Sequence, residues 1–135
     1  MRMSAGPLGR KGNIMEHVLD EKIRGKITEE EMKSFSAEAA RSIVIRYTID
    51  GNSEDRRRDT TPEEADVIRR IIYGALLNIR SGRDIQATAD AAEYIAMQFL
   101  PGAGNRYDEP HANSYDTIYL PIKKWVSLQQ QRVNA

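Results

Sequence analysis

Residues 61–99, TPEEADVIRRIIYGALLNIRSGRDIQATADAAEYIAMQF, decide the fold. Thr61, Pro62 and the two glutamates that follow are typical of a helix start, because they supply a capping hydroxyl, a first-turn proline and carboxylates at the positive end of the helix dipole. The apolar residues beyond them cover about half of a helical circumference, which is wider than the stripe of an ordinary surface helix. We therefore expect this helix to be the central one. Its apolar face holds Ala65, Val67, Ile68, Ile71, Ile72, Ala75, Leu76 and Ile79.

The second half of this stretch predicts another helix. Ser81-Gly82-Arg83 is typical of a turn, and Asp84 is positioned to cap the helix that follows. Alanines on its apolar face allow a partner helix to approach closely, and Pro101-Gly102 ends it. Residues 62–99 therefore predict an αα-hairpin, two helices joined by a short turn. The apolar face comprises Ile85, Ala89, Ala92, Ile95, Ala96 and Phe99.

A second hairpin is predicted over residues 13–45. Its first helix covers about residues 13–24, and Gly25 fits the left-handed position just past a helix end. Thr28 and Glu31 have the spacing of a capping box, in which each side chain accepts the backbone N–H of the other residue. The second helix of this hairpin therefore begins at about Thr28.

The end of that helix is ambiguous. Residues 43–49 alternate with period two, are rich in β-branched side chains and precede the turn signal Asp50-Gly51. Either the helix continues to Tyr47 or a strand begins near residue 43. A strand needs a partner, and residues 117–122 also alternate, although Pro121 would then require an edge position. Both alternatives remain open from the sequence.

Together these signals predict a mainly α fold, a small helical bundle built from two αα-hairpins, with a minor two-stranded β pairing of 43–49 with 117–122 as the alternative. A flexible basic arm, residues 1–12, precedes a single domain over residues 13–135. The parts of that domain are hairpin 13–45, loop 50–61, hairpin 62–99, the Tyr-rich loop 102–116 and the C-terminal segment 117–131.

Composition excludes several classes of function. The 135 residues contain no cysteine, which excludes disulfides, zinc–thiolate sites and cysteine nucleophiles. No run of residues is apolar enough for a transmembrane helix, and the first residues lack the apolar core of a secretory signal. The sequence therefore predicts a cytoplasmic protein.

The 20 basic and 20 acidic residues are unevenly distributed along the chain. Residues 1–27 carry a net charge of +3, residues 28–116 carry −6, and residues 117–135 carry +3. Basic ends and an acidic middle are compatible with charge complementarity within the chain or between subunits.

Catalytic candidates are few. The dense polar segment 105–116 contains His111, which could form an acid–base pair with Asp108 or Asp116. Asp108, Glu109 and His111 could in principle ligate a metal, but neither pattern has the spacing of a known motif. We therefore assign no catalytic residue, metal or cofactor, and keep a small hydrolase or a ligand-binding site around His111 as a third hypothesis.

The leading hypothesis is a non-enzymatic protein-interaction module that associates with itself or another protein. It rests on the wide apolar helix faces and on Tyr, Arg and Asn side chains in the loop 102–116, which are side-chain types that anchor interfaces. The residues expected to form the contact are Tyr73, Leu77, Met97, Arg106, Tyr107, His111, Tyr115 and Trp125.

Nucleic-acid binding is the second hypothesis. The basic residues available for it lie in the N-terminal arm, in an arginine triplet and next to Trp125. Against it, the sequence pI is near 6.7 and Glu29, Glu30 and Glu31 begin the helix that would have to enter a groove. The candidate phosphate contacts are Arg10, Lys11, Arg56, Arg57, Arg58, Lys123 and Lys124.

Overall fold

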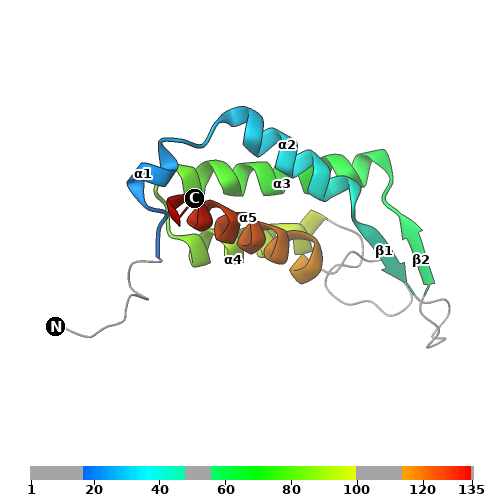
Figure 1. Ribbon diagram of the computed structural model, residues 1–135. Coiled ribbons are helices and arrows are strands. Elements are labelled where there is room, and N and C mark those ends of the chain that lie inside the picture. Colours follow the sequence, from blue (N-terminus) through cyan, green and yellow to red (C-terminus); the bar gives the residue numbers. More distant parts are fainter. Residues whose placement is uncertain (1–16, 48–55, 100–113, 135) are drawn as a thin grey trace.

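The computed structural model describes residues 17–47, 56–99 and 114–134 and confirms a mainly helical protein. Four helices run alternately in opposite directions along one bundle (Figure 1). They are α2 (Glu29–Arg41), α3 (Pro62–Arg80), α4 (Ile85–Phe99) and α5 (Leu120–Gln130). The shorter elements are α1 (Glu21–Arg24), the strands β1 (Val44–Tyr47) and β2 (Arg56–Asp59), the π-helical turn η2 (Tyr115–Tyr119) and the 3-10 turn η3 (Gln131–Asn134).

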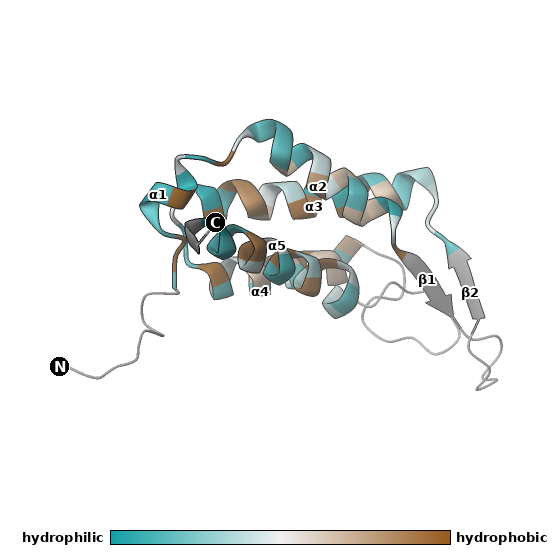
Figure 2. Ribbon diagram, in the orientation of Figure 1, coloured by the Kyte–Doolittle hydropathy of each residue, from teal (hydrophilic) through white to brown (hydrophobic). Residues whose placement is uncertain are grey.

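Helix α3 lies at the centre of the bundle, as its wide apolar face predicts. Ile68, Ile72, Leu76 and Ile79 on this helix have no measurable solvent exposure. Apolar residues of α4, η2 and α5 complete the same core, and Figure 2 shows polar residues dominating α2. Each isoleucine or leucine buried in this way contributes about 1.5–3 kcal/mol.

Capping boxes begin two of the helices. The Thr28 hydroxyl accepts the Glu31 N–H at 3.1 Å, and the Glu31 carboxylate accepts the Thr28 N–H at 3.0 Å, which confirms the predicted box. Thr61 and Glu64 form the same pair at the start of α3. Asp84 caps α4 as predicted, because its carboxylate accepts the Ala87 N–H at 2.8 Å.

The first helix is shorter than the sequence predicts. Of the predicted span 13–24, only Glu21–Arg24 is helical, and residues 13–16 lie outside the described part of the chain. Asp20 begins this helix by accepting the Lys22 N–H at 2.7 Å. Gly25 has a φ of −68°, so the left-handed stop expected there is wrong.

Residues 44–47 form a strand, but the partner predicted for it is wrong. Strand β1 pairs antiparallel with β2, from Val44 opposite Asp59 to Tyr47 opposite Arg56. The predicted loop 50–61 therefore contains a strand, which its arginine triplet did not indicate because charged side chains are poor strand formers. Residues 117–122, the expected partner, are helical.

The π-helical turn η2 has a local cause in Pro121. Proline has no N–H to donate to Thr117, four residues earlier, and its ring crowds that carbonyl. The Leu120 N–H instead bonds to the Tyr115 carbonyl, five residues back, and α5 follows in ordinary α geometry. The alternating apolar residues of 117–122, which resemble a strand in the sequence, therefore lie in a helix.

Gly82, in the turn between α3 and α4, is the position where a side chain should be least tolerated. Its φ is +100°, and a Cβ there would lie 2.9 Å from a guanidinium nitrogen of Arg24. We expect Gly82→Ala to destabilise the protein by roughly 1–2 kcal/mol in urea unfolding. Gly25→Ala is the matched control, since its Cβ would meet nothing closer than 3.7 Å and its φ suits alanine. Equal losses in both variants would contradict this account.

Glu31 should make stability depend on pH. The Thr28 N–H, and then Arg132 at 2.8 Å, hold the pKa of its carboxyl below the ordinary value of 4.5. A lowered folded-state pKa means that the stabilisation is complete above pH 4.5 and is lost as the pH falls below it. Because the pair is half-exposed, we expect less than about 1 kcal/mol.

Urea unfolding of Glu31→Gln measures this contribution. The variant should be less stable than the parent at neutral pH, and the difference should shrink well below pH 4.5. Glu30→Gln, on an exposed position of the same turn, is the control. A difference that persists undiminished in acid would show that the carboxylate charge is not the cause.

Candidate interaction surface

The structure places the residues predicted for an interaction surface in different environments. Tyr73 and Leu77 on α3 are partly exposed and pack against the core. Helix α2 packs against α3. Met97 on α4 is 43% exposed, in agreement with its predicted place on a surface.

The aromatic residues predicted to anchor a contact also lie in different environments. Tyr115 is exposed and stacks on Tyr119, with ring centroids 5.0 Å apart. Trp125 is 2% exposed and belongs to the core, so it is unavailable to a partner molecule. Arg106, Tyr107 and His111 lie outside the described residues.

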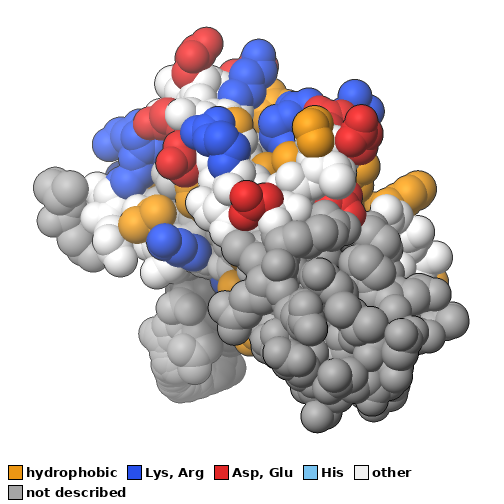
Figure 3. All heavy atoms as spheres, turned by 90° about the vertical axis from the view of Figure 1, so that its right-hand side faces the viewer, with side chains coloured by type: hydrophobic (Ala, Val, Ile, Leu, Met, Phe, Trp, Pro, Cys, Tyr) orange, Lys and Arg blue, Asp and Glu red, His pale blue; other side chains and the backbone are white. Residues whose placement is uncertain are grey.

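Of the basic residues proposed for nucleic acid, the structure describes the side chains of Lys123 and Lys124. Lys123 donates to Gln86 at 2.9 Å and lies 5.8 Å from the centre of the Tyr119 ring, so it is already engaged, whereas Lys124 is exposed. Arg56, Arg57 and Arg58 form β2, and Arg10 and Lys11 lie outside the described residues. Figure 3 views the end of the bundle where α3 begins, and acidic and basic side chains are interspersed there.

A groove lies between α3 and α4, and the middle of it is lined by uncharged side chains. Its volume is about 530 Å³, and Ala75 and Ala92 form part of its lining. Helix α3 contributes Arg70, Ile71, Gly74 and Asn78, and helix α4 with the preceding turn contributes Arg83, Asp84, Ala87, Thr88, Ala91 and Ile95.

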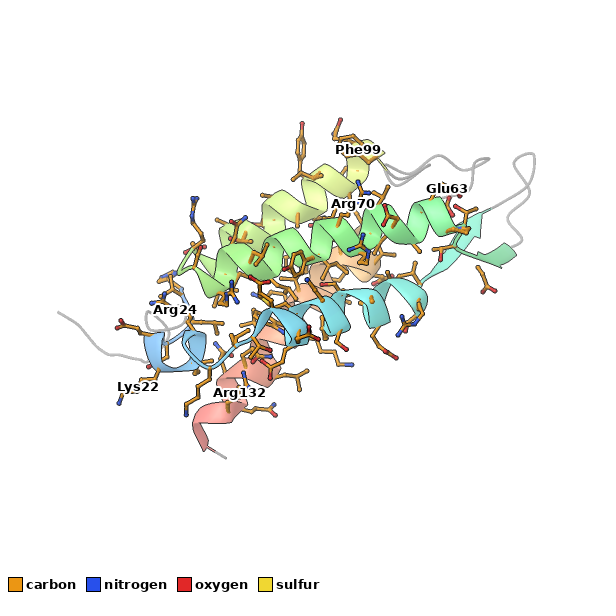
Figure 4. The ribbon with its side chains drawn as sticks, turned by 90° about the horizontal axis from the view of Figure 1, so that it is seen from above. Lys22, Arg24, Glu63, Arg70, Phe99 and Arg132 are labelled. Atoms are coloured by element: carbon orange, nitrogen blue, oxygen red, sulfur yellow. The ribbon has the colours of Figure 1, made fainter. Side chains whose placement is uncertain are left out.

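Side-chain size changes along this groove. The antiparallel course of the helices brings Ile71 beside Ile95 at one end and Asn78 beside Ala87 at the other, with Gly74 and Ala91 between them. Figure 4 shows Arg70 and Phe99 at the end that carries the isoleucines. Large side chains therefore line that end of the groove, and small side chains line its middle.

Charges occur only at the two ends of the groove. At the isoleucine end, Arg70 pairs with Asp66 at 2.9 Å. At the other end, Arg83 lies next to Asp84, whose carboxylate is 3.5 Å from the His17 ring. A hydrogen bond from Arg69 and the charge of Arg70 hold the pKa of Asp66 below its ordinary value. Each end thus carries an acid and a base, while the centre carries neither.

Helix α4 extends this apolar surface beyond the groove. Tyr94 and Phe99 are 65% and 68% exposed, and Ile95 is 43% exposed. The two charged residues of the helix, Asp90 and Glu93, are not among the groove residues. The Gln86 side chain donates to the Asp90 carboxylate and to the Tyr119 hydroxyl of η2, so Asp90 lies on the side of α4 that faces η2. Large apolar side chains left in water at this density are typical of a contact surface.

A second groove separates α2 from the start of α5. Phe35, Ala39, Ile43, Leu120 and Pro121 supply its apolar part. Glu38, Asp116, Lys123 and Lys124 surround it, so both signs of charge lie directly on its rim. Leu120 is 41% exposed there, nearly the same as Ile95 in the first groove.

Two further findings bear on function. Within residues 17–47, 56–99 and 114–134, no group of three or more His, Asp or Glu side chains could hold a metal ion. Among the helices that the structure describes, none is long and apolar enough to span a membrane.

Comparisons with known proteins gave no assignment: no protein-family model, curated protein or solved structure matches the chain.

Sequence reasoning missed the outward side of α4. Ala87, Ala91 and Ile95 recur every four residues on it, a spacing that marks one face of a helix. The sequence pattern assigned Ile95 to the same apolar face as Ala89 and Ala92, so this second face of the helix was not predicted. Two features of the sequence could have predicted this face: Ala87 and Ala91 form an uncharged stripe on α4, and Gly74 is a glycine in the interior of α3.

The burial of Trp125, the single tryptophan, predicts its fluorescence. Iodide should quench the folded protein several-fold less than the urea-unfolded protein, because the indole is shielded from water. A single-stranded oligonucleotide should leave the emission unchanged, since no base can stack on the ring. Equal quenching in the folded and unfolded states would contradict the placement of this residue.

Proposed function

We propose that this protein is a non-enzymatic interaction module that self-associates through the α3–α4 groove. The observation that carries the proposal is the uncharged middle of this groove together with the exposed apolar side chains of Tyr94, Ile95 and Phe99 on α4. A helix surface of this kind binds a complementary helical surface by burying apolar area. The proposal keeps the function expected from the sequence and moves the surface from Tyr73 and Leu77 to the other side of α3.

Several features favour this function over the alternatives. The buried Trp125 removes the stacking residue from a nucleic-acid site, and Lys123 is engaged within the protein. The groove residues include no nucleophile paired with a base, which argues against catalysis at this surface. His111, the centre of the third hypothesis, lies outside the described residues.

Light scattering after size-exclusion chromatography tests the proposal. The parent protein should form a stable oligomer, and Ile95→Asp should weaken association by about 100-fold or more. The substitution removes the apolar contact of Ile95 and buries a charged aspartate in each copy. A tenfold change in the dissociation constant corresponds to about 1.4 kcal/mol of binding free energy. Apolar burial predicts little loss of the oligomer at high salt.

Leu120→Asp is the matched control, because Leu120 has almost the same exposure but lies in the α2–α5 groove. It should leave the oligomer intact. Thermal unfolding should show that both variants remain folded. A parent protein that is monomeric at low and high salt would refute self-association, and dissociation by Leu120→Asp alone would move the interface to the other groove.

A further inference from the structure

We propose that the groove between α2 and the start of α5 binds a small amphipathic carboxylate, such as a free fatty acid of medium chain length. The apolar chain lies between the two helices, and the carboxylate pairs with Lys124. This inference concerns a different surface from the α3–α4 groove and does not depend on self-association. It rests on the size and lining of the cavity and on the one charge around it that has no partner among the described residues.

The two helices that form this groove are held together near the start of α2. There Glu31 pairs at 2.8 Å with Arg132, which follows α5. Toward the end of α2 a cavity of about 580 Å³ lies between the helices, a volume typical of small-molecule sites. Its lining extends from Phe35 to Ile43, about 12 Å along α2. The cavity therefore has room for a flexible apolar chain.

Apolar side chains lie on both sides of the cavity. Helix α2 contributes Phe35, Ala39 and Ile43, which also pack against the core. The start of α5 contributes Leu120 and Pro121, and Leu120 is 41% exposed. An acyl chain placed here removes apolar surface from water on both helices. Each methylene group buried in this way should tighten binding by about fourfold.

The charged groups around the cavity select the sign of the ligand's charge, because all but one of them are already engaged. Glu38 pairs with Arg41 at 2.7 Å. Asp116 takes part in an interaction within the chain, and Lys123 donates a hydrogen bond to α4. Lys124 is exposed at the cavity and has no hydrogen bond or ion pair with any described residue. The charge that remains is positive, so the cavity favours an anion.

The two carboxylates at the cavity limit the ligand further. Glu38 and Asp116 lie among its lining residues together with Lys124. A doubly charged phosphate would be repelled by both carboxylates more strongly than a singly charged group. A single carboxylate at the end of an apolar chain therefore matches one ammonium group at the edge of an apolar cavity.

Calorimetric titration with hexanoate, octanoate and decanoate, below their micelle-forming concentrations, tests the proposal. Octanol serves as the uncharged analogue of octanoate. Each added methylene group should tighten carboxylate binding by up to about fourfold until the cavity is filled. Lys124→Gln should weaken octanoate binding by about two- to fivefold, the strength of an exposed ion pair, and leave octanol binding unchanged. High salt should reduce the effect of this substitution.

The other variants locate the ligand. Lys33→Gln is the matched control for charge, since Lys33 is an exposed lysine of α2 that does not line the cavity, and it should change neither affinity. Leu120→Asp should weaken both ligands by about tenfold or more, because it removes part of the apolar wall and adds a negative charge. If that variant folds poorly, Ala39→Leu should act in the same direction by filling the cavity.

The outcomes separate this proposal from self-association. Ile95→Asp alters the other groove and should bind octanoate as the parent protein does. A parent protein that binds none of the three carboxylates would overturn the inference and leave the groove to a protein partner. An equal effect of Lys124→Gln on octanoate and octanol would overturn it too, and so would binding that survives both Leu120→Asp and Ala39→Leu. A monomeric parent protein that binds octanoate would refute self-association alone.

Discussion

The bundle depends on the burial of helix α3. Its four fully buried residues, Ile68, Ile72, Leu76 and Ile79, contribute about 6–12 kcal/mol together, which is comparable with the whole net stability of a small domain. A helix with apolar residues over half of its circumference must be covered on more than one side. Helices α2, α4 and α5 provide that cover, and the short turn between α3 and α4 makes those two helices antiparallel.

The same constraint explains where the candidate surface lies. Helix α2 packs against α3, and η2 and α5 pack against α4. The remaining junction of α3 and α4 is lined by small residues on both helices and receives no further element of the described chain. The groove is thus the part of the α3–α4 junction that no other described element covers.

Local signals predicted the helix starts because they act over a few residues. Thr28 with Glu31, Pro62 after Thr61, and Asp84 all lie where the structure begins a helix. Signals that depend on distant partners were less informative. The partner of strand β1 was misassigned because alternation over 117–122 is compatible with a strand until Pro121 is placed within a helical turn. The described part of the first helix begins later than the apolar pattern predicts, directly after the capping residue Asp20.

The sequence by itself determined the class of fold, the central helix and the starts of the main helices, since periodicity and capping are properties of neighbouring residues. It also showed that cysteine chemistry is excluded. Only the tertiary structure decided which apolar side chains remain in water: it buried Trp125, covered Tyr73 and Leu77, and left Ile95 and Tyr94 exposed. Exposure depends on which helix packs on which face, and that choice is made by the whole bundle rather than by any one segment.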